Sequence, residues 1–154
     1  MIDEKITLAL SPFWLADLIE QFVNGYAKPV PFQLVYLVVP LVLRRESRVP
    51  LASCKNTSTI YSAFLETANK RSRVSALQLA VTNYSEHVRL AMLAYSARGH
   101  ELDIMLVNMP VDRLRNDTTN STVKEYFRAA YNLGVILSKE ELAACFYKLG
   151  VFKV

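Results

Sequence analysis

An almost unbroken run of apolar residues, from Phe32 to Leu43, limits the possible folds of this chain more than any other feature. The run is apolar on every side, so a buried helix or strand must carry it through a core. A helix needs about twenty apolar residues to cross a bilayer, whereas this run has about twelve and includes Gln33 and Pro40. We therefore predict a central buried element and no membrane span.

The secondary structure of this run is open from sequence. Its valines favour a strand, whereas its length is typical of a helix. Pro40 would cost a helix one hydrogen bond and kink it, but in a central strand it would break the ladder. We favour a helix and keep a strand as the alternative.

Helical spacing dominates residues 1–99. Ser11 and Pro12 are typical of a helix start, and we expect Gly25 to end that first helix in a left-handed cap. Its other face carries polar residues, including Asp17 and Glu20, so we expect a half-buried helix. After a polar linker at 53–59, three amphipathic stretches follow at 60–68, 74–81 and 88–95, and Gly99 closes this part.

The remaining segment, 100–154, changes character. Residues 100–109 alternate with a period of two, which predicts a small β element or hairpin, and the polar stretch 115–122 predicts a loop. Two capping boxes, Thr122 with Glu125 and Ser138 with Glu141, predict a pair of helices that end at Gly134 and Gly150. The predicted fold class is mainly α, with this small β element and C-terminal helix pair.

Composition supports one folded domain over residues 1–154. A hydrophobic content of 52% can fill a core, and 21% charged and 10% aromatic residues are unlike a disordered chain. The first residues lack the basic and apolar segments of a secretory signal, so we expect a cytoplasmic protein.

Residue types that carry enzyme chemistry are sparse. His87 and His100 lie in no catalytic motif, and Cys54 and Cys145 lack the spacing of a zinc site or a disulfide framework. Four glycines cannot form a Gly-rich phosphate loop. We therefore expect no catalytic, cofactor-binding or metal-binding residues, and no enzyme activity.

Two basic groups are the candidate contact residues for a protein partner or DNA, although a solvated rim is an equal alternative. They are Arg44, Arg45 and Arg48 after the apolar run, and Lys70, Arg71 and Arg73 further on. We expect the three arginines of the first group to be exposed, so that their joint replacement by Ala leaves the protein folded. The net charge of +4 does not decide between the partners.

The C-terminal helix pair also allows a second function. Its connection from Gly134 to Ser138 has the length and the glycine of a helix-turn-helix, so a small DNA-binding regulator is the alternative. Glu140 and Glu141 beside that second helix would repel phosphate, which favours simple helix packing.

Several segments together resemble one family. They are SPFWLA from Ser11, PFQLVYLVVPLVLRR from Pro31, the Arg48-Val-Pro50 step, and the endings Leu133-Gly134 and Leu149-Gly150-Val151. They look like the middle component of three-component ABC systems, the small subunit of Lamassu-type bacterial defence operons. Ser11 and Arg44 depart from the asparagine and the histidine expected at those positions.

This resemblance implies a non-catalytic accessory subunit that needs no cofactor. It would join an SMC/Rad50-like ATPase to an effector, often a nuclease, in defence against phage or plasmid DNA, and would meet DNA through the complex.

Overall fold

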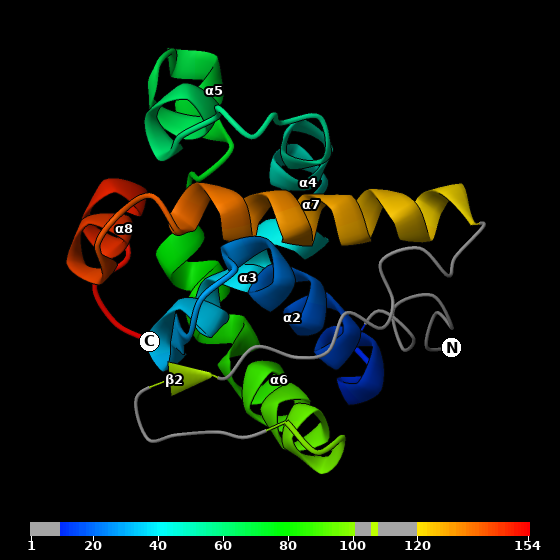
Figure 1. Ribbon diagram of the computed structural model, residues 1–154. Helices are drawn as coiled ribbons and strands as arrows, with labels where there is room; N and C mark the ends of the chain where they lie inside the picture. The colour runs from blue at the N-terminus through cyan, green and yellow to red at the C-terminus, as the bar shows by residue number, and fades with distance from the viewer. Residues whose placement is uncertain (1–9, 101–105, 108–119) are drawn as a thin grey trace, which may run out of the picture.

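The computed structural model describes residues 10–100, 106–107 and 120–154. These residues are mainly helical, as predicted (Figure 1). Helix α2 (Pro12–Tyr26) packs against α7 (Ser121–Leu137) and against α6 (Leu77–Ala97). Helix α4 (Arg45–Ala52) lies on α7, and α8 (Leu142–Leu149) follows α7 as the second member of the predicted C-terminal pair.

The apolar run forms a helix, which decides the alternative that its sequence left open. A short 3-10 turn, η1 (Phe32–Leu34), leads into α3 (Val35–Leu43), and every residue from 35 to 42 is buried. Helix α3 packs against α6, α7 and α4, so protein surrounds it as its composition requires. Pro40 lies inside the helix.

A small β element lies where the alternating pattern predicted it. Strand β2 (Leu106–Val107) pairs antiparallel with β1 (Val30–Pro31), with Val30 opposite Val107 and Pro31 opposite Leu106. The partner strand is therefore the connector before α3. Residues 115–119 of the predicted loop 115–122 lie outside the described residues. Residues 121 and 122 belong to α7.

Two expected helical stretches, 74–81 and 88–95, are one helix. Helix α6 is continuous from Leu77 to Ala97, because the polar residues that suggested a break lie on its outer side, as exposed Asn83 and Glu86 show. The stretch 60–68 is instead a single π-helical turn, η2 (Tyr61–Leu65), followed by the short helix α5 (Ala68–Ser72).

Gly25 and Gly134 do not end helices, which corrects the prediction. Both lie inside α2 and α7, where the two helices cross. A methyl group at Gly25 would overlap the carbonyl oxygen of Tyr131, and one at Gly134 would overlap that of Phe22. Glycine is therefore needed for the close approach of two backbones. Helix α2 ends one residue later than expected, with Ala27 at φ 60°.

Both predicted capping boxes are also wrong. Asn120 caps α7, because its side-chain oxygen accepts hydrogen bonds from the backbone N–H groups of Thr122 and Val123. Ser138 donates to the carbonyl of Val135, so it does not cap α8. The left-handed ends at Gly99 and Gly150, with φ of 88° and 72°, are confirmed.

Candidate interaction surface

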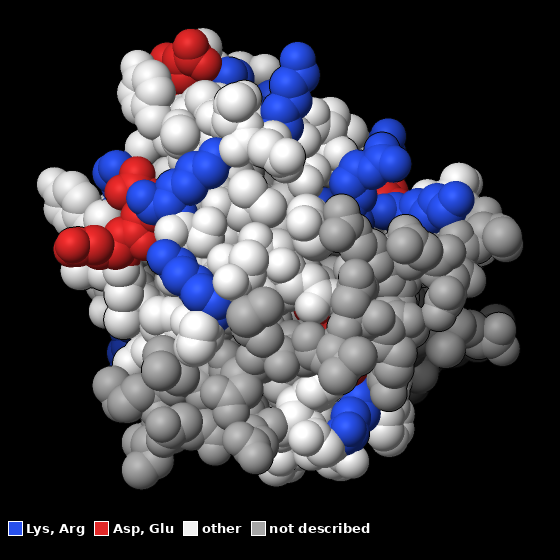
Figure 2. All heavy atoms as spheres, in the orientation of Figure 1, with Lys and Arg blue, Asp and Glu red and all other residues white. Residues whose placement is uncertain are grey.

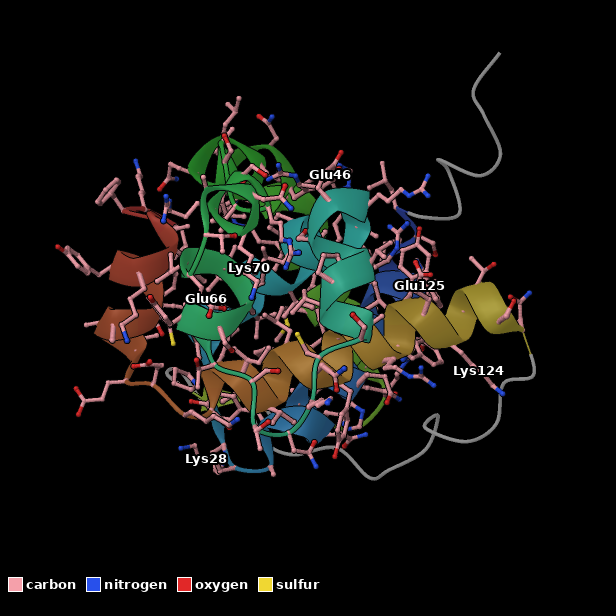
Figure 3. All side chains as sticks on the ribbon, turned by 90° about the horizontal axis from the view of Figure 1, so that it is seen from above. Lys28, Glu46, Glu66, Lys70, Lys124 and Glu125 are labelled. Carbon is pink, nitrogen blue, oxygen red and sulfur yellow. The ribbon has the colours of Figure 1, made fainter. Side chains whose placement is uncertain are left out.

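Arg48 is an internal brace between α4 and α7. Its Nε lies 2.9 Å from Oε1 of Glu125, its guanidinium stacks 4.1 Å from the ring centroid of Tyr126, and its Nη1 donates to the carbonyl of Leu43 at 2.8 Å. The side chain is only 12% exposed. Figure 3 shows Glu125 on the stretch of α7 that passes beside α4. The expectation that all three arginines after α3 are exposed is therefore wrong for Arg48.

Arg44 and Arg45 share the neighbourhood of Arg48 but have different environments. Arg44 is half-buried, and its Nη2 donates to the carbonyl of Ser75 at 3.0 Å. Arg45, at the start of α4, is exposed. Of these three residues, Arg45 is the one most available to a partner.

The second basic group, Lys70, Arg71 and Arg73, folds back on the π-helical turn η2. The three side chains donate to the carbonyls of Ser62, Leu65 and Ala63 at 2.7, 3.1 and 3.0 Å respectively. Such contacts suit cations, because the carbonyl end of a helical turn carries partial negative charge.

One of these cations also has an acidic partner. The Nζ of Lys70 lies 2.7 Å from Oε2 of Glu66, and Figure 3 shows the two side chains on neighbouring turns. The other acceptors of this group are neutral carbonyls.

An open hollow of about 340 Å³ lies between the end of α4, the turn after it, η2 and α5. It brings Lys70 and Arg73 together with Lys55, but Arg44, Arg45, Arg48 and Arg71 do not line it. The complete lining is Pro50, Ser53, Cys54, Lys55, Ser58, Ser62, Ala63, Lys70 and Arg73. The lining carries positive charge and hydroxyl groups but no carboxylate.

A buried charge network, absent from the sequence reasoning, joins α2 to the end of α6. Glu20 is 1% exposed, and its Oε1 lies 3.0 Å from Nη1 of Arg98 and 2.9 Å from Nε2 of His100. Asp17 binds the same Arg98 nitrogen at 2.6 Å. Burial, followed by the charge of Glu20, raises the pKa of Tyr95, whose ring lies 4.3 Å from that of His100.

This network corrects the view of α2 as half buried, because Glu20 does not lie on a solvated face. Helical periodicity offered no signal for it, since a carboxylate outside the apolar stripe of a helix normally indicates exposure.

The two cysteines differ in environment. Cys145 is fully buried, and burial raises its pKa to about 11. Burial also raises the pKa of Cys54, while a hydrogen bond with Ser58 and the charges of Arg73 and Lys70 oppose the shift. Within the described part of the chain, His, Cys, Asp and Glu side chains form no group that could hold a metal ion.

The fold and its charged contacts define a small helical protein whose cations mostly brace its own elements. The chain belongs to the ABC-three component (ABC-3C) system Middle Component 3 family, whose model matches residues 1–153. The match confirms the predicted resemblance to the middle component of three-component ABC systems. Comparison with curated proteins and with solved structures finds no match. None of the described helices is both long and apolar enough to span a membrane.

Proposed function

We propose that this protein is a non-catalytic accessory subunit of a Lamassu-type defence complex. It joins an SMC/Rad50-like ATPase to a separate effector, a nuclease, in the cytoplasm. The family match carries this proposal, because a middle component of a three-component system works with the other components.

Exposed apolar side chains support an assembly role. Leu93 on α6 is 68% exposed, Tyr147 on α8 is 83% exposed and Phe152 in the terminal segment is 86% exposed. Aromatic side chains of this kind are enriched at protein interfaces. Two hydrogen bonds to Oε1 of Gln78, from the backbone N–H groups of Phe152 and Lys153 at 2.6 and 3.1 Å, hold the terminal segment against α6.

The charges support the same proposal in preference to a helix-turn-helix regulator. Residues 134–137 belong to α7, so the turn lies later than a helix-turn-helix reading requires. Lys148 is paired with Glu140 at 2.7 Å, and Lys139 donates to the carbonyls of Asn56 and Ser58. The basic side chains around α8 are therefore engaged within the protein.

The test is co-expression with the proteins encoded beside it. A tagged copy should recover an SMC/Rad50-like ATPase and an effector in one complex, and the Tyr147→Ser and Phe152→Ser double variant should recover less of at least one of them. Thr82→Ala and Ser85→Ala, two polar changes on α6, form the control variant. A neighbourhood without an SMC-like ATPase, or a wild-type protein recovered alone, refutes the proposal.

A further inference from the structure

Net positive charge is concentrated in about one fifth of the chain. Residues 44–75 contain seven Lys and Arg and two Asp and Glu, a net charge of +5, whereas the whole chain has +4. The rest of the chain is therefore close to neutral, at −1. On the face turned to the viewer in Figure 2, the Lys and Arg side chains of the described residues form several separate groups, with uncharged or acidic residues between them. The charge is instead focused where α4, η2 and α5 meet.

The hollow described above lies within this segment. Lys55, Lys70 and Arg73 line it together with the hydroxyl-bearing Ser53, Ser58 and Ser62. Figure 3, which looks down on α4 and α5, shows Lys70 on α5, close to Glu66. Its volume, about 340 Å³, is at the lower end of the range of small-ligand sites, about 300–1,000 Å³.

Backbone carbonyls hold Lys70 and Arg73 at the hollow, but carboxylates offset only part of the positive charge there. The carbonyl of Ala63 orients Arg73 but carries no formal charge to offset it. Glu66 offsets Lys70 alone, at 2.7 Å, and this carboxylate is half exposed. The ammonium of Lys55 has no hydrogen bond or ion pair within the described residues.

We propose that this hollow binds a phosphate group. Lys55 and Arg73, which have no acidic partner among the described residues, supply the charge-assisted hydrogen bonds that phosphate oxygens favour. The hydroxyl groups of Ser53 and Ser62 already donate to backbone carbonyls, so these two cations carry the proposal. The π-helical turn has a role in this arrangement, because its carbonyls hold Arg73 and Lys70 at the rim. The phosphate comes from a nucleic-acid backbone or from a small phosphorylated molecule, and the inference does not rest on the proposed accessory function.

Cys54 in the lining provides a reporter for occupancy. Its thiolate should react with iodoacetamide, a neutral reagent, whereas the buried Cys145 with a pKa of about 11 should not. A bound phosphate shields the thiol and disfavours its thiolate by charge repulsion. We expect inorganic phosphate to slow alkylation of Cys54 by about threefold or more relative to chloride at equal ionic strength. Peptide mass spectrometry measures the two cysteines separately.

Variants show whether the protection comes from this site. Lys55→Glu reverses a charge whose side chain has no internal bond in the described structure, so the fold should survive, and it should abolish the protection. Lys124→Glu, an exposed lysine on α7, makes the same charge change elsewhere and should leave the protection intact. Circular dichroism checks that both variants are folded.

A short DNA duplex, titrated in parallel, identifies the source of the phosphate. Protection by the duplex at far lower concentration than by inorganic phosphate assigns the site to a nucleic-acid backbone. Equal or weaker protection by the duplex assigns it to a small phosphorylated molecule. The proposal is wrong if neither probe slows alkylation, or if protection persists in Lys55→Glu as in Lys124→Glu.

Discussion

Replacing Arg48 by methionine should destabilise the protein by about 2–3 kcal/mol, although a surface arginine would normally contribute far less. The hydrogen bond from this cation to the carbonyl of Leu43 contributes about 1.5 kcal/mol, and the stacking on Tyr126 about 1 kcal/mol. The ion pair adds only about 0.5 kcal/mol, because Glu125 is 40% exposed and solvent screens it. Methionine keeps the apolar stem of the side chain, so the decrease in the free energy of unfolding measures the contribution of the guanidinium group.

Urea denaturation followed by circular dichroism measures this change, with Arg45→Met as the matched control. Arg45 is exposed one turn earlier on α4, and its replacement should shift the free energy of unfolding by less than about 0.5 kcal/mol. A double-mutant cycle with Glu125→Gln should give a coupling energy below about 1 kcal/mol. If Arg48→Met is as stable as Arg45→Met, the proposed brace between α4 and α7 does not contribute.

The remaining predictions concern the buried contacts. Gly134→Ala should lower the free energy of unfolding by about 3 kcal/mol or more, because the added methyl group overlaps a backbone carbonyl of α2, and thermal unfolding measures the loss. Glu20→Gln should lower the free energy of unfolding by about 3–5 kcal/mol in urea denaturation, because the guanidinium of Arg98 loses a buried carboxylate partner, whereas Glu86→Gln at an exposed pair should change it little. The folded-state pKa of Cys145, about 11, lies above its ordinary value of 9.0, so stability is full below pH 9 and falls as pH rises toward 11; Cys145→Ala should reduce that slope.

Helices with a strong periodic pattern could be predicted from residues alone. The start of α2 at Pro12 and the burial of residues 34–42 follow from local chemistry, because a proline in the first turn and an all-apolar surface each have few alternatives. The family could be recognised for a similar reason, since the pattern from Ser11 to Pro50 is carried by consecutive residues. The predicted breaks within α6 and the two capping boxes failed because short-range signals compete with packing.

The candidate site was only partly predictable. The sequence indicated two clusters of cations, but it could not show that Arg48 and Arg71 are tied to carbonyls, or that Lys55 joins Lys70 and Arg73 around one hollow. Lys55 and Arg73 are separated by a linker, η2 and α5, and only folding back of that segment brings them together.

The sequence by itself determined that this chain buries one apolar run, carries a net charge of +5 in residues 44–75 and belongs to its family. These properties reside in composition, local periodicity and consecutive motifs, so they can be read without knowing which segments touch. Tertiary structure alone decided that Gly25 and Gly134 meet at a helix crossing and that Glu20 is buried against Arg98. Both features depend on residues far apart in the chain. The two glycines lie inside helices because the backbones of two helices approach closely there, although glycine by itself favours helix ends. Glu20 is buried because a distant cation pairs with it, although a carboxylate by itself favours solvent.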